Sequence, residues 1–235
     1  MVLMKKRWSI GILLAVMLFL SGCGADKTLY DELSKKQAES AAESGVIALQ
    51  VYFSEDGTEG EYTAELTYSK TESGYTYCQK QFDPNGQVTF CEYSDGNATE
   101  QWMIGRGWEE IGESGFTEEK PHRYIVMCTV APEYRLVQRI EKTEDSAGVC
   151  YTASLDPGKA KEAFYKESGC DVVKQEITVS FDPEGKLAGY REETVLHNTE
   201  SGCDNVYRAE LSFREHNNIT KVERPALRTH YGAAK

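Results

Sequence analysis

Four histidines and seven cysteines are the first residues of this 235-residue chain to examine for chemistry. The histidines His122, His197, His216 and His230 lack the spacing of metal ligands, and the chain has no HExxH, GxSxG or phosphate-binding glycine loop. His197 and His216 could be neighbours across the last strands, although exposed histidines in a polar hairpin are commoner. Pairs of carboxylates indicate nothing, because so many could be imagined as acid and base. We therefore expect neither an enzyme, nor a metal site, nor a cofactor.

The cysteines fit an exported protein better than a zinc or redox-motif protein, because none of them forms a CxxC pair. Apart from Cys23, the chain contains Cys78, Cys91, Cys128, Cys150, Cys170 and Cys203. An even number suits disulfides, but the sequence does not choose their connectivity, and an anaerobe could leave some thiols free. Cys170 and Cys203 precede strands that we expect two apart, at roughly 10 Å, which exceeds the usual disulfide span unless a loop folds over. If Cys78 pairs with Cys91 and Cys170 with Cys203, Cys128 and Cys150 are the two cysteines that remain.

One cysteine pair can be examined through hairpin geometry. The segment YTYCQKQFDPNGQVTFCEY predicts a hairpin around its DPNG turn. A four-residue loop opposes Phe82 to Gln87 and therefore Cys78 to Cys91, which would permit a disulfide. A G1 bulge at Gly86 would instead move the register by one residue and turn the two thiols to opposite faces. Both registers stay open.

The remaining cysteine ends an N-terminal export signal. A basic cluster at residues 5–7 precedes an uncharged apolar run that is shorter than the roughly 20 residues of a spanning helix. The run ends in LSGC, which resembles the lipobox of bacterial lipoproteins. That resemblance implies acyl chains such as palmitate on Cys23, cleavage before it, and a lipid anchor on the extracytoplasmic side of the cell membrane. Gly24 follows instead of Asp, which leaves a Gram-positive outer face and a Gram-negative outer membrane both open. The alternative is an ordinary thiol at Cys23 after an uncleaved or conventionally cleaved signal.

Net charge argues against a nucleic-acid partner. The whole chain carries a formal charge of −12, and loss of residues 1–22 removes three basic residues and no acidic one, which leaves −15. Such a chain is repelled by nucleic acid and by bare anionic lipid. The acidity is spread along the sequence, so we interpret it as a solvated surface.

Most of the chain alternates apolar and polar residues in short stretches separated by glycine-containing turns, which is typical of an antiparallel meander. Strands are predicted within residues 46–53, 61–69, 75–93, 98–111, 123–130, 136–156, 171–198 and 205–225, the last range holding one strand and a short further one at ITKVERP. Helices are predicted at 26–44 and at about 157–168, the second with Asp156 as its N-cap and Pro157 in its first turn. The predicted class is mainly β with two helices.

The order of these elements resembles that of the LolA/LolB and LppX/LprG-type lipoproteins. The likeness is carried by WMIGRGWEEI, by VCYTASLDPGKAKEAF and by the terminal VERP, and it extends over most of residues 27–225. It implies a strongly curved antiparallel sheet, or unclosed β-barrel, whose concave side is plugged by helices. The predicted organisation is a signal peptide at 1–22, a lipidated tether and helix at 23–44, one curved-sheet domain at 45–225, and a tail at 226–235.

A curved sheet with a concave apolar face could hold acyl chains or could be filled by its own core. The candidate lining residues share the apolar phase of their strands: Leu49, Val51, Leu66, Tyr68, Trp102, Trp108, Ile177, Val179, Phe181, Leu211 and Phe213. One hypothesis is a lipid-anchored carrier of a lipid or acylated molecule. The other is a surface or envelope-sensing module that binds a protein partner through a sheet edge or a tyrosine-rich face.

Overall fold

The computed structural model describes residues 25–72, 74–111, 124–125 and 128–228. Its strands are β1 Ser44–Glu55, β2 Thr58–Thr71, β3 Gly74–Phe82, β4 Val88–Ser94, β5 Thr99–Met103, β6 Gly107–Glu110, β7 Val137–Asp145, β8 Gly148–Leu155, β9 Cys170–Phe181, β10 Leu187–Asn198 and β11 Asp204–Arg214. Its helices are α2 Lys27–Glu39, the 3₁₀ turn η1 Tyr134–Leu136, and α4 Pro157–Phe164.

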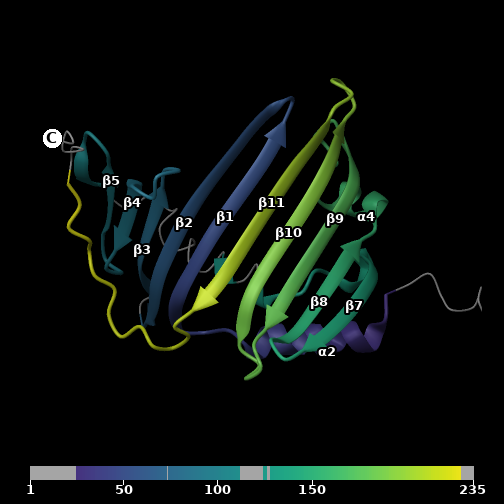
Figure 1. The fold of residues 1–235 in the computed structure, drawn as a ribbon, viewed down its shortest axis with the longest axis horizontal. Coiled ribbons are helices and arrows are strands. Elements are labelled where there is room, and N and C mark those ends of the chain that lie inside the picture. The colour runs from purple at the N-terminus through teal and green to yellow at the C-terminus, as the bar shows by residue number, and fades with distance from the viewer. Residues whose placement is uncertain (1–24, 73, 112–123, 126–127, 229–235) are drawn as a thin grey trace, which may run out of the picture.

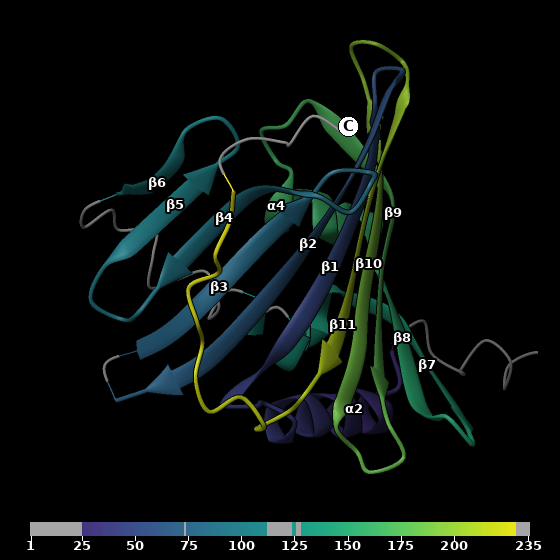
Figure 2. The ribbon, with the colours of Figure 1, turned by 60° about the vertical axis from the view of Figure 1, so that its left-hand side comes forward.

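All eleven strands belong to one antiparallel sheet in the order β6-β5-β4-β3-β2-β1-β11-β10-β9-β8-β7 (Figure 1). Pairing of β1 with β11 joins the N-terminal and C-terminal halves of the sheet. The outermost strands β6 and β7 are not paired with each other in the described part of the chain, so the sheet stays open. Figure 2 shows its strong curvature. The predicted class, mainly β with two helices and an unclosed curved sheet, is confirmed.

The two faces of the sheet differ because successive side chains of a strand point to opposite sides. We call the side that carries Leu49 and its partner Leu211 the helix face, because the core formed with α2 lies there. The side that carries Ala48 and its partner Ser212 is the outer face. Leu33 of α2 is 1% exposed within the helix-face core.

Local capping explains where the two helices begin. The side chain of Asp26 accepts hydrogen bonds from the backbone N–H groups of Thr28 and Leu29 at 2.8 and 3.2 Å. The Asp156 side chain does the same for Lys159 at 2.9 Å, and Pro157 occupies the first turn of α4. Both carboxylates satisfy amide groups that a helix N-terminus leaves without partners.

Two similar turns, FDPNG and FDPEG, connect β3 to β4 and β9 to β10. In each turn the glycine N–H donates to the aspartate carbonyl at 2.9 Å, from Gly86 to Asp83 and from Gly185 to Asp182. The two glycines have φ values of +77° and +81°, a region that residues with a side chain rarely adopt. The demands of the turn are therefore enough to explain why the two sequences are alike.

Two predicted strands are wrong. In the 123–130 segment, the described residues 124–125 and 128–129 are helical, and Thr129 Oγ1 bonds the carbonyl of Ile125 one turn earlier. A short apolar run fits a buried helix as well as a strand, and here Ile125 and Cys128 both face the helix-face core. The short strand predicted at ITKVERP is also absent, because residues 219–228 form no strand.

Residues 219–228 instead form an extended segment that we call the strap. It leaves β11 and runs toward β5 (Figures 1 and 2, yellow). Ser69 Oγ donates to the carbonyl of Ile219 at 3.3 Å, and Val222 is 5% exposed in a cluster with Cys78, Cys91 and Trp102. The strap therefore covers apolar side chains on the outer face of β3 to β5.

The described core lies entirely within residues 25–228. Ala25 is 8% exposed and its carbonyl accepts a hydrogen bond from Tyr134 Oη at 2.8 Å. A protein comprising residues 25–235 contains every residue of the described core, so we expect it to fold.

Candidate functional site

Nine of the eleven predicted lining residues lie on the helix face and belong to its core or pack against it. Most of them are packed too tightly to line an open space. Val179 and Phe181 are 0% and 1% exposed, and both face other core side chains. These positions are structural core, whereas Val51 also lines a cavity.

The two tryptophans do not lie with the other nine. Trp102 pairs with Cys91 on one side and with Trp108 on the other, and these residues share the outer face with Cys78. Arg224 of the strap lies over the Trp108 ring at 4.2 Å and pairs with Glu100 at 2.6 Å. Trp102 and Trp108 therefore cannot line a helix-face cavity. The sequence pattern could not reveal this, because the strap occupies a face that alternation alone would leave to solvent.

A cavity of about 590 Å³ opens on the helix face, between the sheet and the segment after α4. This volume lies within the range of small-molecule sites. Its lining combines apolar and polar side chains from β1, β9, β10, β11 and that segment: Val51, Glu55, Tyr165, Ser168, Cys170, Glu192, Thr194, Leu196, Asn198, Asn205, Tyr207, Arg208 and Ala209. The cavity is therefore amphipathic.

Glu192 of β10 is one of three charged residues in the lining of this cavity, with Glu55 and Arg208. Its two carboxylate oxygens accept one hydrogen bond each, from Gln175 Nε2 at 2.9 Å and from Tyr190 Oη at 3.1 Å. No lysine or arginine of the described residues forms an ion pair with it. The nearby Arg208 guanidinium donates to Glu193 Oε2 at 3.0 Å. Because Glu193 follows Glu192 in the strand, it lies on the outer face, and the charge of Arg208 is directed away from the cavity.

The tyrosines around the cavity remain neutral hydroxyls. Burial raises the pKa of Tyr165 and of Tyr190, and the charge of Glu192 raises both further. Burial and the charge of the nearby Glu55 carboxylate raise the pKa of Tyr207. These phenols can therefore donate hydrogen bonds at any physiological pH, but they cannot act as bases there.

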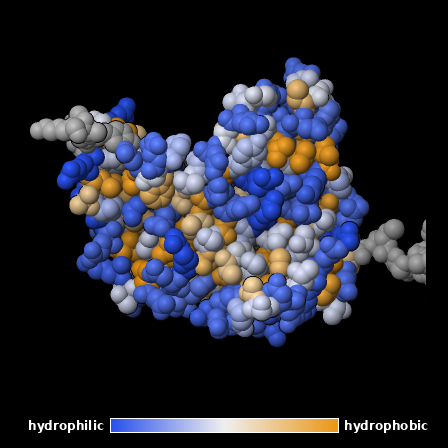
Figure 3. All heavy atoms as spheres, in the orientation of Figure 1, coloured by the Kyte–Doolittle hydropathy of each residue, from blue (hydrophilic) through white to orange (hydrophobic). Residues whose placement is uncertain are grey.

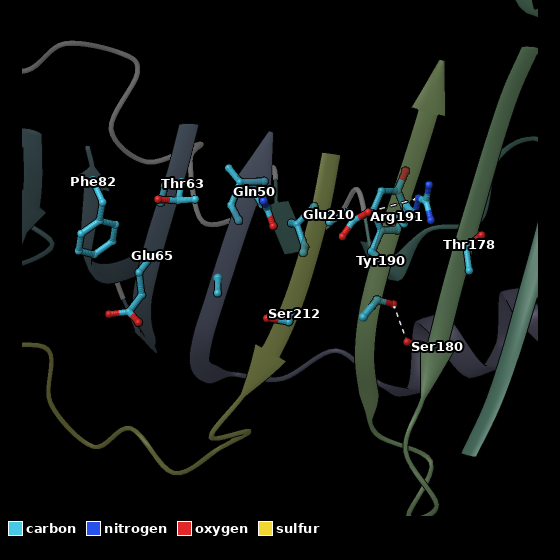
Figure 4. A pocket seen from close by; sticks show the side chains of 15 residues that line it. Gln50, Thr63, Glu65, Phe82, Thr178, Ser180, Tyr190, Arg191, Glu210 and Ser212 are labelled. Carbon is cyan, nitrogen blue, oxygen red and sulfur yellow. Dashed lines mark hydrogen bonds and ion pairs between the residues drawn. The ribbon is translucent and has the colours of Figure 1, made fainter. Parts of the chain in front are cut away.

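A second hollow, of about 510 Å³, lies on the outer face (Figure 4). It follows a row of short side chains, in which Ala48 is opposite Ser212, Ser212 opposite Gly189, and Gly189 opposite Ser180. Ion pairs border it, including Arg191 with Glu210 at 3.4 Å. Figure 3 shows that the surface over these central strands is mostly hydrophilic. We interpret this hollow as a trough left by small residues.

The structure shows that several of the cysteines lie on opposite faces of the sheet or on strands that are not adjacent. Cys128 is buried in the helix-face core, whereas Cys150 pairs with Ser180 on the outer face, so the sheet lies between their thiols. Cys170 starts β9 and Cys203 precedes β11, with β10 between these strands. All six cysteines after Cys23 are free thiols in this structure.

Cys78 and Cys91 are in contact, although in neither of the two predicted registers. A register irregularity between Gln81 and Phe82 places Cys78 opposite Tyr93 and Lys80 opposite Cys91. The register has moved by two residues from the simple four-residue loop, so the thiols share a face as diagonal neighbours. Their sulfur atoms are 3.6 Å apart, and the side chains are 4% and 0% exposed.

The described histidines lie apart. His197 Nδ1 is 2.8 Å from Asp204 Oδ1 at the start of β11, whereas His216 stacks on Phe213 beyond its other end. The two histidines are therefore not neighbours, because β11 lies between them. No group of three or more potential metal ligands occurs among the described residues. His122 and His230 are outside them.

Sequence reasoning missed most of the cavity wall. It chose the large apolar residues of β9 and β11, whereas the wall also contains Ala209, Thr194 and Glu192. A usable signal was present in β10, where Tyr190, Glu192, Thr194 and Leu196 share one phase. A glutamate in the phase of buried residues is uncommon and would have indicated a polar site.

Comparison with known proteins gives structural neighbours only. No family model and no curated protein matches the sequence. LprF from Mycobacterium bovis is 9% identical, with 86% of this chain and 100% of that chain covered and a TM-score of 0.45. The lipoprotein LppX from Mycobacterium tuberculosis is 11% identical, with 82% and 99% covered and a TM-score of 0.45. A LolA superfamily protein from Nitrosomonas europaea is 11% identical, with 79% and 92% covered and a TM-score of 0.32. The description of the fold therefore depends on the strand order and register of this chain.

Within the described residues, no helix is both long and apolar enough to cross a bilayer.

Proposed function

We propose that this protein is a lipid-anchored extracytoplasmic lipoprotein that binds an amphiphile, a lipid or acylated molecule, in its helix-face cavity. The observation that carries the proposal is the cavity of about 590 Å³ between the sheet and the segment after α4. Val51, Leu196 and Ala209 provide apolar wall for an acyl chain, while Glu192, Tyr165 and Thr194 provide polar groups for a head. A mostly apolar pocket with a few convergent polar groups is the usual form of a small-molecule site.

The proposal assigns the protein a binding role without a catalytic step. It also assigns the segment at 1–22 as the export signal and Cys23 as the acylated residue. The support is the basic, apolar and LSGC order of residues 5–23. Export into an oxidising compartment would in addition allow Cys78 and Cys91 to form a disulfide.

The alternative function, a module that binds a protein partner, gains less support. Large exposed apolar side chains of the described residues are few and come from separate elements, such as Tyr62 of β2, Phe164 of α4 and Val173 of β9. A protein-binding surface normally presents a contiguous apolar patch. The central outer face is mostly hydrophilic (Figure 3).

Filling the cavity tests the proposal. Ala209 lines it and is partly exposed, so the indole of Ala209→Trp should occupy the ligand space without entering the packed core. Residues 25–235 would be produced with export, and the co-purifying lipid measured by native mass spectrometry and organic extraction. We expect a stoichiometric lipid in the parent protein and at least a tenfold loss in Ala209→Trp.

Ala48→Trp is the matched control, because Ala48 is also a partly exposed alanine of the central sheet but lies on the outer face. It should retain the lipid. An empty parent protein whose interior also excludes lipid probes would contradict the carrier proposal and favour the partner-binding module. Equal lipid content in the two tryptophan variants would contradict the position of the site.

A further inference from the structure

Among the described residues, the helix-face cavity has carboxylates in its wall and no lysine or arginine side chain that balances them. Glu192 is in the wall, and its neighbours Gln175 and Tyr190 are uncharged donors. A carboxylate has about four acceptor positions, and each oxygen of Glu192 uses one of them for these donors. Both oxygens can therefore accept a further hydrogen bond from a ligand.

The mouth of the cavity also carries a negative charge. Glu55, the last residue of β1, lines the cavity together with Tyr207. Arg208 is the one basic residue in the lining, and its guanidinium bonds Glu193 and lies 5.9 Å from the centre of the Tyr52 ring, both on the outer face. The described lining thus presents two carboxylates and no ammonium or guanidinium group to the interior.

A second acceptor lies beside Glu192. Gln175 is 5% exposed, and its amide nitrogen must face the carboxylate, because turning the amide would bring two acceptor oxygens together. Its Oε1 then has no hydrogen-bond partner in the described structure. A buried hydrogen-bond acceptor without a donor costs free energy of folding. The surroundings of Gln175 and Glu192 therefore have hydrogen-bond acceptors to spare and too few donors.

From this arrangement we infer that the cavity selects amphiphiles whose head group donates hydrogen bonds and carries no negative charge, with Glu192 as the residue that sets this selectivity. The inference rests on the proposed carrier function and names its ligand class. An anionic head would meet Glu192 in a partly buried site, where repulsion is stronger than in water. An ammonium or hydroxyl head would use the free acceptor positions.

The test uses three probes with the same 12-carbon chain: dodecylamine, monolauroylglycerol and dodecanoate. Residues 25–235, delipidated, would be loaded with the uncharged dye Nile red, and each probe would be titrated as a competitor at pH 7. We expect dodecylamine and monolauroylglycerol to bind at least tenfold more tightly than dodecanoate. In Glu192→Gln, which keeps the shape of the side chain, the disadvantage of dodecanoate should shrink about tenfold.

Glu210→Gln is the matched control. It removes the same charge from the molecule, but on the outer face, and should leave the order of the probes unchanged. Glu55→Gln is a second variant, expected to reduce the disadvantage of dodecanoate less, because Glu55 lies at the exposed mouth. If Glu192→Gln fails to fold, the parent protein and Glu55→Gln still decide the question.

The outcomes separate the two proposals. Dodecanoate binding as tightly as the other probes, or an equal gap in parent and Glu192→Gln proteins, would overturn the selectivity while leaving the carrier function intact. Failure of Nile red and all three probes to bind would overturn the carrier function itself.

Discussion

Cys78 and Cys91 are two buried thiols in contact on the outer face, with their sulfur atoms 3.6 Å apart. The hydrogen bond between the two sulfurs and the charge of Lys80 hold the pKa of the Cys78 thiol below its usual range, against the effect of burial. The same hydrogen bond, together with burial, raises the pKa of Cys91. Cys78 is therefore the thiolate that would attack an oxidant, because thiolates and not thiols are the nucleophiles.

We predict that these two thiols form a disulfide after export. Each thiol loses a proton and the pair loses two electrons, which the disulfide of an exported thiol oxidoreductase would accept. Closing a loop of this length should stabilise the fold by about 3 kcal/mol relative to the reduced form. Alkylation under denaturing conditions, followed by peptide mass analysis, measures the pair. Two alkylated thiols at Cys78 and Cys91 in protein taken from the oxidising compartment would refute the prediction, and exposed Cys203 serves as the control thiol.

At the scale of elements, the strap takes the place of the short strand that was predicted at ITKVERP. It is attached at its start, where Ile219 N–H donates to Ser44 Oγ at 3.2 Å, and near its end, where Arg224 pairs with Glu100. Between these points Val222 enters the cluster around Trp102. The strap therefore shields from water the apolar residues that β3 to β5 carry on the outer face.

Val222→Asp should loosen the strap. Val222 is 5% exposed, and a carboxylate there would be buried without a partner, so we expect a loss of about 2–4 kcal/mol in the free energy of unfolding. Thr220→Asp, two residues earlier at an exposed position, should change it by less than about 0.5 kcal/mol. Denaturant unfolding followed by tryptophan fluorescence measures both. Equal stabilities of the two variants would show that the strap does not contribute to the core.

At the scale of the whole molecule, the proposed anchor and the proposed cavity belong to different parts of the chain. The described sheet begins at Ser44, after α2, whereas the proposed acylated residue Cys23 precedes the first described residue. A net charge of −12 for the chain disfavours direct adsorption to anionic lipid, so attachment to a membrane would depend on the acyl chains.

Cys23→Ala tests that attachment. In a bacterial host fed an alkyne analogue of palmitate, the parent protein should incorporate the label and Cys23→Ala should lose it. Cys203→Ala, which removes an exposed cysteine instead, should remain labelled. Label that persists in Cys23→Ala would contradict the lipoprotein assignment.

Local sequence was sufficient for features that depend on neighbours in the chain. The period-2 alternation along β9 and β11 predicted the buried face, Asp156 and Pro157 predicted the start of α4, and the two DPxG turns predicted their hairpins. These features depend on alternation, capping and turn geometry, which act over a few residues.

The features that the sequence did not predict depend on long-range packing, that is, on which surfaces meet after the chain folds. The two-residue register shift that brings Cys78 to Cys91 arises from an irregularity near a turn, and the covered position of Trp102 arises from a segment more than 100 residues later in the chain. Glu192 and Ala209 become walls of one cavity only because the segment after α4 folds over β10 and β11. The phase of Glu192 in β10 could have indicated a polar position on the buried face, but no local pattern shows which segments enclose it, so the cavity itself depends on the tertiary structure.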